Sequence, residues 1–229
     1  MEFTKLSNRL DLVASFVPAG ARLLDVGSDH AYLPIALLQE GKIEAAIAGE
    51  VVEGPYQSAL QNVADNGLED KIEVRLANGL AAFEPVDCIS CITIAGMGGR
   101  LIADILAAGL EKLANVYRLV LQPNNREDEL RDWLVDHDFR IVDEAILEEN
   151  EKFYEILVVE QGSQELSAKE LRFGPYLMQE QAPAFVQKWS KEVEKLAFAL
   201  EQVPVENQSA RASLEERVEQ IKEVLHVSK

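Results

Sequence analysis

The chain has 229 residues, of which 22 are basic and 40 acidic, and its net charge is −18. This length suits one α/β domain with a small additional part. No apolar stretch reaches about 18 residues, so we expect no membrane span. The first residues show no secretion signal, so we expect a cytoplasmic protein. The acidic balance argues against a nucleic-acid partner without excluding one.

The negative charge is concentrated in residues 1–162, which hold 13 basic and 29 acidic side chains, whereas residues 163–229 hold 9 and 11. Because salt screens charges over about 8 Å, local patches matter more than the total. Gln161-Gly162-Ser163 marks the expected boundary. We therefore predict a front domain over residues 1–162 and a small helical, coiled-coil-like domain over residues 163–229.

An amphipathic segment opens the chain, with Leu6, Leu10, Val13 and Val17 at helical spacing before Pro18. Strand-like and helix-like runs then alternate. We expect strands over Ala21–Val26, Ala45–Val51, Ile72–Leu76, Cys88–Ile94, Tyr117–Leu121, Ile141–Leu147 and Phe153–Val159. Helices are expected over Ala31–Glu40, Gly54–Asn66, Gly98–Leu113, Arg126–His137, Ala184–Val203 and Val205–Val227.

This alternation predicts a doubly wound, Rossmann-like α/β sheet whose strands are mostly parallel. Only Glu148–Lys152 separates the last two strands, and such a short link cannot cross over the sheet. We therefore expect an antiparallel hairpin at one edge, which is the layout of class I methyltransferases. The last two helical runs are joined by a turn at Pro204, which predicts an antiparallel helical pair.

The first strand runs into a tight turn that begins with Asp25, Gly27 and Ser28, and Glu50 ends the second strand. Such a sheet holds an adenosine-bearing cofactor with a backbone turn under the ligand and a carboxylate on its ribose. The dinucleotide pattern G-x-G-x-x-G would need glycines where Asp29 and Tyr32 stand. A pyrophosphate beside Asp29 is unfavourable, so we expect S-adenosylmethionine and exclude a nicotinamide-dependent dehydrogenase.

Further candidate cofactor contacts follow the other strands. They are Val51 beside Glu50, then Asn78 and Gly79, and then Ala95, Gly96 and Met97 in the glycine-rich run Ala95–Arg100. The alternatives are an ordinary surface acid at position 50 and simple turns at the other two places. Three glycines within four residues favour close approach of a ligand over a mere turn.

Gln122, Pro123 and Asn124 follow the fifth strand, and their polar groups are candidates for binding a base. A helix cap by Asn125 would explain part of this segment without a function. Cys88 and Cys91 are expected to be two small buried side chains of one strand. Their side chains would point to opposite faces of the sheet, so they cannot form a disulfide with each other. We find no cluster of metal ligands in the sequence and expect no metal.

Several of these motifs occur together, in order. They are Asp25-Val-Gly-Ser-Asp-His-Ala-Tyr-Leu-Pro34, Gly49-Glu-Val51 with Gly54-Pro55, Asn78-Gly-Leu80, Ala95-Gly-Met-Gly-Gly99 and Gln122-Pro-Asn-Asn125. Together they resemble the bacterial tRNA (adenine-22-N1)-methyltransferase family, often called TrmK. The resemblance covers essentially the whole chain. It implies methyl transfer from S-adenosylmethionine to N1 of an adenine in the D-arm region of tRNA.

Such a transfer needs little acid–base help, because N1 of adenine carries a free lone pair and the methyl donor is already activated. Alignment is the main task. A carboxylate near the cationic product ring would stabilise it or accept an N6 proton. Asp29 is our candidate for that carboxylate, with capping of the next helix as its alternative role. His30 is expected to help hold the base or the methionine, or simply to pack.

The target adenine must leave its stack, and Tyr154 and Tyr32 are candidates for receiving it. Lys188, Lys191 and Lys195 in the C-terminal helices are candidates for contacts with tRNA phosphates, and solvated helix faces are the alternative. No obligate protein partner is evident. Two other functions stay open from the residues alone: a methyltransferase acting on a small molecule or protein, and a non-catalytic cofactor-sensing module.

Overall fold

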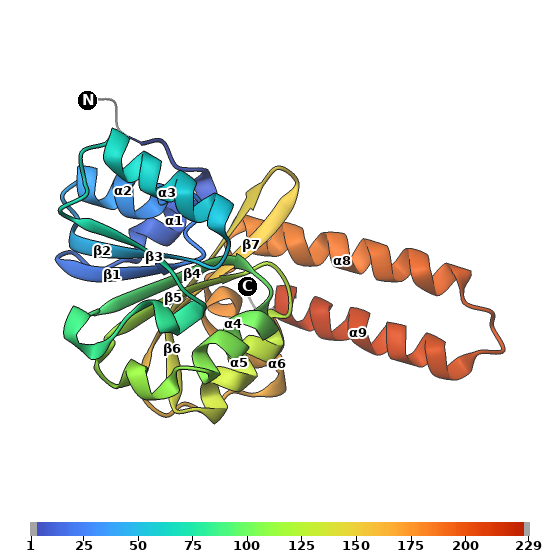
Figure 1. Ribbon diagram of the computed structural model, residues 1–229. Coiled ribbons are helices and arrows are strands. Elements are labelled where there is room, and N and C mark those ends of the chain that lie inside the picture. Colours follow the sequence, from blue (N-terminus) through green and yellow to red (C-terminus); the bar gives the residue numbers. More distant parts are fainter. Residues whose placement is uncertain (1–3, 227–229) are drawn as a thin grey trace.

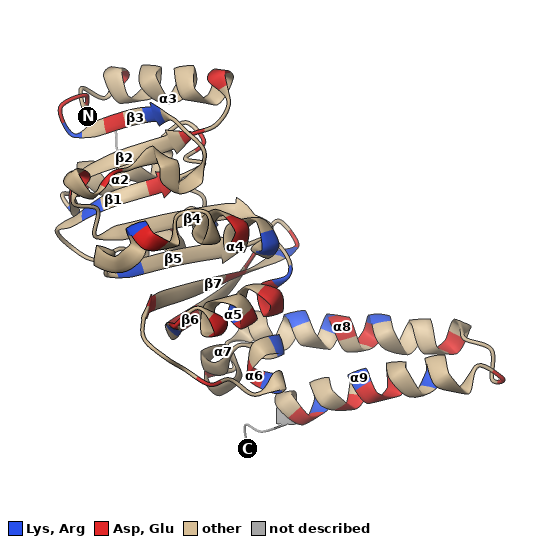
Figure 2. Ribbon diagram, turned by 60° about the horizontal axis from the view of Figure 1, so that its bottom comes forward, with Lys and Arg blue, Asp and Glu red and all other residues tan. Residues whose placement is uncertain are grey.

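The structure is a computed structural model that describes residues 4–226. Its centre is a seven-stranded sheet with the strand order β3-β2-β1-β4-β5-β7-β6, which can be followed from top to bottom in Figure 2. The strands are β1 (Ala21–Val26), β2 (Ile43–Glu50), β3 (Ile72–Leu76), β4 (Cys91–Met97), β5 (Arg118–Pro123), β6 (Phe139–Glu149) and β7 (Lys152–Gln161). The first five pair in parallel, and β7 is antiparallel to both β5 and β6. The predicted doubly wound sheet with an antiparallel edge hairpin is confirmed.

Helices cover both faces of the sheet (Figure 1). They are α1 (Asn8–Ser15), α2 (Tyr32–Gln39), α3 (Glu53–Asp65), α4 (Gly99–Ala107), α5 (Glu127–Asp136), α6 (Ala168–Phe173), α7 (Pro175–Glu180), α8 (Pro183–Gln202) and α9 (Gln208–His226), with 3-10 turns η1 (Gly79–Ala82), η2 (Pro85–Asp87) and η3 (Leu110–Asn115). Val13, Leu33 and Val63 bring α1, α2 and α3 into one core cluster. Ile102 and Leu130 bring α4 and α5 into the cluster on the other face.

The order of the strands places a crevice at one edge of the sheet. From β1 the chain moves outward to β2 and β3, and it then returns to β4 on the other side of β1. The loops that leave β1 and β4 therefore diverge to opposite faces, and ligands of such sheets bind at this switch point.

Two sequence expectations are wrong in detail. The strand expected from Cys88 begins at Cys91, because Cys88 ends the turn η2 with a left-handed φ of 53°. Cys91 is buried, but Cys88 is exposed, and both are free thiols. The helix expected over Gly98–Leu113 stops at Ala107, and the chain continues after Gly109 as η3.

The C-terminal helices α8 and α9 lie side by side and extend away from the sheet (Figure 1). The predicted antiparallel pair is present, although residue Val227 of its second predicted helix lies outside the described residues. Arg211 closes the tip by donating to the carbonyl oxygens of Leu200 and Val203, at 3.0 Å each. No helix within residues 4–226 is long and apolar enough to cross a membrane.

A buried ion group attaches these helices to the sheet. Arg131 of α5 is fully buried and donates to Glu144 of β6 at 2.8 Å and to Glu155 of β7 at 2.5 Å. Lys188 of α8 donates to the other oxygen of Glu155 at 2.7 Å. The second oxygen of Glu144 accepts from the amide of Tyr176 in α7 at 3.0 Å. Since each carboxylate joins two elements, the group sets the position of α7 and α8 on the hairpin.

We predict that Arg131→Met lowers the free energy of unfolding at pH 8 by about 3–5 kcal/mol, because it leaves Glu144 and Glu155 as buried carboxylates without their shared cation. Arg140→Met is the matched control. Arg140 lies on β6, is half exposed and pairs with Glu160 at 3.2 Å, so its loss should cost less than about 1 kcal/mol. Denaturant unfolding measures both, and equal losses would contradict the role of the ion group.

The difference in the free energy of unfolding between wild type and Arg131→Met should become smaller from pH 8 to pH 5. Burial raises the pKa of Glu155, but Arg131 and Lys188 outweigh it and the net shift is downward. In wild type its stabilisation is therefore present above the unfolded pKa and lost on acidification. Burial already raises the pKa of Glu144 in wild type, against the effect of Arg131. Loss of Arg131 removes a cation that lowers the pKa of both carboxyls, so the folded variant binds more protons than folded wild type and its deficit in stability shrinks as the pH falls.

Candidate active site

The turn after β1 is built from left-handed backbone. Gly27 has φ +66°, and Asp29, His30 and Ala31 follow with φ 43°, 70° and 59°. Three successive residues with a Cβ in this region cost about 1–2 kcal/mol each. The turn is held from β2 and α3, because the amide of Asp29 donates to Glu50 at 2.6 Å and Asn62 donates to the carbonyl of His30 at 3.0 Å. Strain maintained in this way is typical of functional sites.

Asp25 fixes the start of the turn from inside the sheet. Its carboxylate is buried and accepts from the hydroxyls of Ser28 and Thr93, at 2.6 Å each. Burial raises its pKa, against these two hydrogen bonds. Asp25 therefore orders the turn through two side-chain hydroxyls rather than through backbone amides. Thr93 of β4 was not identified from the sequence.

Glu50 lies at the end of β2 and is nearly buried. One carboxylate oxygen holds the amide of Asp29 at 2.6 Å, and no other described residue donates to the second oxygen. Burial raises the pKa of this carboxyl, and the Asp29 amide acts in the opposite direction. A carboxylate with one oxygen tied to the turn and one free suits a ribose hydroxyl. Val51 and Asn78 are exposed beyond it, and Gly79 begins η1 with φ +55°.

A cavity of about 320 Å³ opens at the carboxyl ends of β1, β4 and β5. It gathers many of the residues predicted from the sequence. Its lining is Asp25, Gly27, Ser28, Asp29, Leu33, Ala95, Gly96, Met97, Asn124 and Tyr154, with Arg9 and Leu10 from α1. The absence of a side chain at Gly27 matters here, because a Cβ would collide with the terminal methyl of Met97.

Asp29 and His30 lie at the rim of this cavity. The Asp29 carboxylate is 84% exposed and lies 3.4 Å from Nε2 of His30, whose ring is 5.4 Å from that of Tyr32. Asp29 does not cap the next helix, which was its alternative role, because α2 begins after Ala31 and has no side-chain cap. Its carboxylate is therefore free to face a ligand, and its catalytic role stays a prediction.

The segment after β5 differs from expectation. Gln122 and Pro123 are both buried, so neither residue is accessible for direct contact with a base. The Gln122 side-chain oxygen accepts from the amide of Gly96 at 3.0 Å and from Arg9, and its nitrogen donates to Pro123 and Asn124. Only Asn124 is exposed, with its side chain donating to the carbonyl of Gly96 at 2.7 Å.

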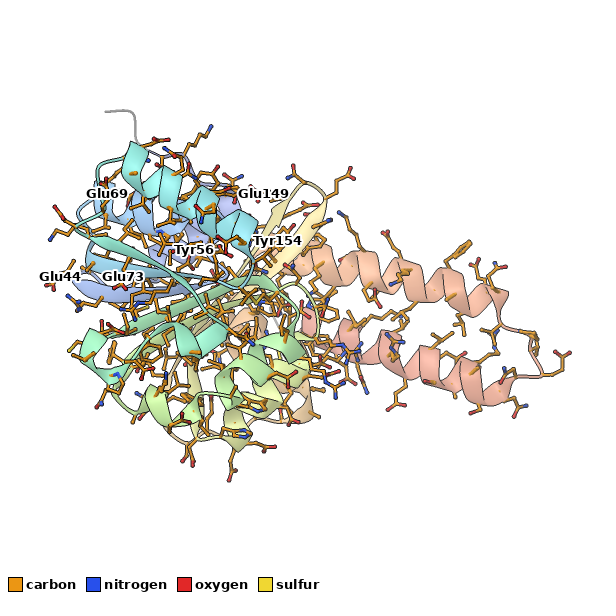
Figure 3. The ribbon with its side chains drawn as sticks, viewed as in Figure 1. Glu44, Tyr56, Glu69, Glu73, Glu149 and Tyr154 are labelled. Atoms are coloured by element: carbon orange, nitrogen blue, oxygen red, sulfur yellow. The ribbon has the colours of Figure 1, made fainter. Side chains whose placement is uncertain are left out.

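Tyr154 of β7, labelled in Figure 3, lines both this cavity and a second one of about 560 Å³. The second cavity is lined by Asn124 and Asn125 after β5, Glu127 of α5, the start of β7 over residues 152–154, and Lys188 of α8. The two spaces therefore share an edge, with the cofactor residues on one side and the C-terminal helices on the other.

The three predicted phosphate-binding lysines differ in exposure. Lys188 is mostly buried and pairs with Glu155 and Glu127, which makes a phosphate contact compete with two carboxylates. Burial lowers its pKa, but these carboxylates outweigh it and the net shift is upward. Lys191 is half exposed, with its ammonium 4.9 Å from the centre of the Phe153 ring, and Lys195 is 78% exposed. Figure 2 shows the basic bands along α8.

The chain is similar to known proteins over nearly its whole length. The family model "tRNA (adenine(22)-N(1))-methyltransferase", TrmK, matches residues 23–223. The tRNA (adenine(22)-N(1))-methyltransferase of Bacillus subtilis (strain 168) is 41% identical over 98% of this chain and 99% of its own. A Streptococcus pneumoniae protein solved in complex with S-adenosyl-L-methionine is 66% identical, with a TM-score of 0.90, over 97% of this chain and 100% of its own. TrmK of M. capricolum, solved with S-adenosyl-homocysteine, is 29% identical, with a TM-score of 0.85, over 98% and 99%.

The residues present fit S-adenosylmethionine. At Gly27 the cavity is lined by backbone alone, so a ligand can approach it closely. Glu50 has one oxygen that accepts no hydrogen bond from the described residues and that suits a ribose hydroxyl. No described residues form a group of three or more His, Cys, Asp or Glu that could hold a metal ion. Arg9 is the main lining residue that the sequence did not reveal, because its segment showed only an apolar stripe.

We predict that Gly27→Ala weakens binding of S-adenosylhomocysteine by about tenfold or more, because Met97 must move into the cavity to admit the new methyl group. Gly41→Ala is the matched control, since Gly41 also has a left-handed φ, +69°, but nothing lies within 4 Å of its Cβ position. Both variants should lose about 1–2 kcal/mol of stability. Isothermal titration calorimetry compares the affinities, and an equal affinity of the two variants would refute this account of Gly27.

Proposed function

Because the chain belongs to the tRNA (adenine(22)-N(1))-methyltransferase family, we infer that it transfers the methyl group of S-adenosylmethionine to N1 of adenine 22 in tRNA. The observation that carries this inference is a match over 98% of this chain and 99% of the Bacillus subtilis enzyme. The match includes the cofactor loop, the edge hairpin and the C-terminal helices. The cavity at the switch point of the sheet lies where such a cofactor binds.

The cofactor contacts divide between two regions of the carboxyl edge. We propose that Glu50 binds the ribose hydroxyls and that Val51, Asn78 and Gly79 surround the adenine. The turn with Gly27 and Ser28, together with Ala95–Met97, borders the methionine half. Asp25 acts through the turn, because both of its oxygens are already bound to Ser28 and Thr93.

The chain aligns the reaction and stabilises its product. Bound S-adenosylmethionine supplies an electrophilic methyl group on a sulfonium. The N1 lone pair of adenine attacks this methyl group, the sulfur–methyl bond breaks, and S-adenosylhomocysteine is the leaving group. The enzyme therefore needs no base before attack, and alignment supplies most of the rate. The product ring is cationic, and the exposed carboxylate of Asp29 at the cavity rim is placed to stabilise it or to accept an N6 proton. His30, 3.4 Å from that carboxylate, orients it.

The shared edge of the two cavities is the proposed place for the target base. Tyr154 and Asn124 border both spaces, so a flipped adenine between them would reach the cofactor from the side of the hairpin. Extrusion of a base costs a few kcal/mol, which stacking on Tyr154 would offset. Tyr32, 42% exposed beside His30, is the second aromatic at the rim.

Residues 163–229 are the proposed tRNA-binding domain. They are nearly balanced in charge, with 9 basic and 11 acidic side chains, in contrast to the acidic front domain. Lys191 and Lys195 are the more exposed lysines of α8, although Lys191 pairs with Glu148 at 3.0 Å and Lys195 with Glu192 at 3.4 Å. A tRNA substrate places the activity in the cytoplasm.

We predict that the protein transfers label from S-adenosylmethionine to unmodified tRNA as 1-methyladenosine, and that a tRNA with guanine at position 22 accepts none. Asp29→Asn should lower kcat about 10²-fold, because it removes the charge beside the cationic product and keeps the shape. Asp70→Asn, an exposed carboxylate at the opposite edge of the sheet, is the control. Nucleoside analysis by mass spectrometry identifies the product.

Full activity of Asp29→Asn would keep the function and remove Asp29 from its mechanism. Tight cofactor binding without label in any tRNA would instead contradict the function. The methyl acceptor would then be a small molecule or protein, or the chain would be a binding module.

For the C-terminal helices, we predict that the double variant Lys191→Glu/Lys195→Glu binds tRNA more weakly. The slope of log affinity against log salt concentration should fall by the amount that about two phosphate contacts contribute, while the affinity for S-adenosylhomocysteine is unchanged. Lys71→Glu/Arg140→Glu makes the same change of total charge on the front domain and serves as the control. Filter binding over a range of salt concentrations measures both. If the two double variants lose affinity equally, total charge rather than α8 determines tRNA binding.

A further inference from the structure

The second cavity extends beyond the place proposed for the target base. Its volume of about 560 Å³ is within the range of sites that hold whole small molecules. The target adenine is placed at the edge that it shares with the cofactor cavity, beside Tyr154 and Asn124. Asn125, Lys152 and Phe153 border the second cavity and not the cofactor cavity. These three residues take no part in cofactor binding or in the placement of the target base.

The second cavity is basic, although the chain as a whole is acidic. Two lysines and one glutamate line it, whereas the cofactor cavity has two acids and one arginine. A cavity of about 250 Å³ at the amino ends of β1, β2 and β3 has four acids and two basic residues. Lys188 is paired with two carboxylates, but no described carboxylate pairs with the exposed Lys152. Glu149, which lies opposite Lys152 in the hairpin, accepts from the amide of Asn8 instead. The ammonium group of Lys152 is therefore available to an anion.

Phe153 adds an aromatic ring to the lining. It is half-buried, packs against the apolar cluster of the C-terminal helices, and has the ammonium of Lys191 4.9 Å from the centre of its ring. Tyr154, the next residue, has Arg9 over its ring instead. The two rings therefore face different sides of the hairpin, with Phe153 toward α8 and Tyr154 toward the cofactor cavity. Asn125 is exposed, and no described residue forms a hydrogen bond with its side-chain amide.

An aromatic ring, an unpaired ammonium group and an amide are the groups that hold a single-stranded nucleotide. Bases that have left their stack are bound on aromatic side chains and by hydrogen bonds to their edges, while basic side chains hold the phosphates. The target adenine stays joined to its neighbours through phosphates, so a neighbouring nucleotide must lie one backbone link away from it. The second cavity begins at Tyr154 and has room for that nucleotide.

We propose that the second cavity binds the nucleotide next to the target adenine, with its base on Phe153 and its phosphate at Lys152. The side-chain amide of Asn125 is then a hydrogen-bonding partner for the edge of that base. This inference rests on the proposed function, because it takes tRNA as the substrate. The enzyme therefore recognises two adjacent nucleotides rather than a single flipped base, and its acceptor must release both from their stack.

A double perturbation tests the contact between Phe153 and the neighbouring base. Phe153→Leu keeps an apolar side chain against the helical cluster but removes the flat ring. On unmodified tRNA we expect kcat/KM to fall about tenfold, because the stacking of one base on an aromatic ring is lost. The same tRNA is then made with an abasic nucleotide at position 21 or at position 23, on either side of adenine 22. On one of these two tRNAs the variant and wild type should differ by less than about twofold, because the stacking base is already absent.

Phe16→Leu is the matched control, since Phe16 is also half-buried and packed against a core cluster but borders neither cavity. It should leave kcat/KM unchanged on all three tRNAs. If Phe153→Leu loses as much activity on both abasic tRNAs as on the intact one, the inference is overturned, because the ring then acts without touching a neighbouring base. Full activity of Phe153→Leu on intact tRNA, or a weaker affinity for S-adenosylhomocysteine, would overturn it as well.

Lys152→Gln tests the phosphate contact. We expect weaker tRNA binding and a slope of log affinity against log salt concentration that is lower by the contribution of about one phosphate contact. Lys71→Gln makes the same change of charge at the amino edge of the sheet and should keep the wild-type slope. An unchanged slope in Lys152→Gln would contradict the phosphate contact. Wild-type protein that methylates no tRNA would contradict the proposed function itself, whereas a failed test in an active protein contradicts this inference alone.

Discussion

The left-handed turn between Gly27 and Ala31 is the constraint on which the candidate site depends. Its backbone is unfavourable on its own and persists because β2 and α3 hold it through Glu50 and Asn62. One oxygen of the Glu50 carboxylate holds the amide of Asp29, and we propose that the other binds a ribose hydroxyl of the cofactor. The turn that we propose as part of the cofactor site therefore also places Asp29 in the lining of the cavity.

A second constraint joins the site to the C-terminal helices. Buried ion pairs contribute little net stability, but the loss of one partner is costly, so such a group favours a single arrangement of the elements it joins. Arg131, Glu144, Glu155 and Lys188 come from α5, β6, β7 and α8. Tyr154 is the neighbour of Glu155 on β7. The helical pair is thereby held in a fixed position relative to the cavity edge at which we place the target base.

The sequence predicted the sheet and most of the cavity because those features are local. The alternation of strand-like and helix-like runs predicted the sheet and its edge hairpin. The residues that follow β1 and β4 form contiguous motifs, which can be recognised in the sequence. Its errors involve partners that are distant in the chain. Arg9 and Gln122 are 113 residues apart, and no periodicity links them. For the same reason the sequence, which made Gln122 and Lys188 candidates for substrate contacts, did not show that Gln122 is buried or that Lys188 pairs with Glu155 and Glu127. The misplaced start of β4 has a local cause, since an apolar run does not reveal the left-handed residue Cys88.

The central claim is that the left-handed turn and Glu50 together form the cofactor site, with Asp29 at its rim, from which the methyl group passes to N1 of the target adenine. A crystal structure of this protein with S-adenosylhomocysteine tests it most directly. The account predicts ribose hydroxyls within hydrogen-bond distance of the free Glu50 oxygen and the sulfur in the cavity between Gly27 and Asn124. A ligand whose ribose lies away from Glu50, or whose sulfur lies outside that cavity, would contradict it.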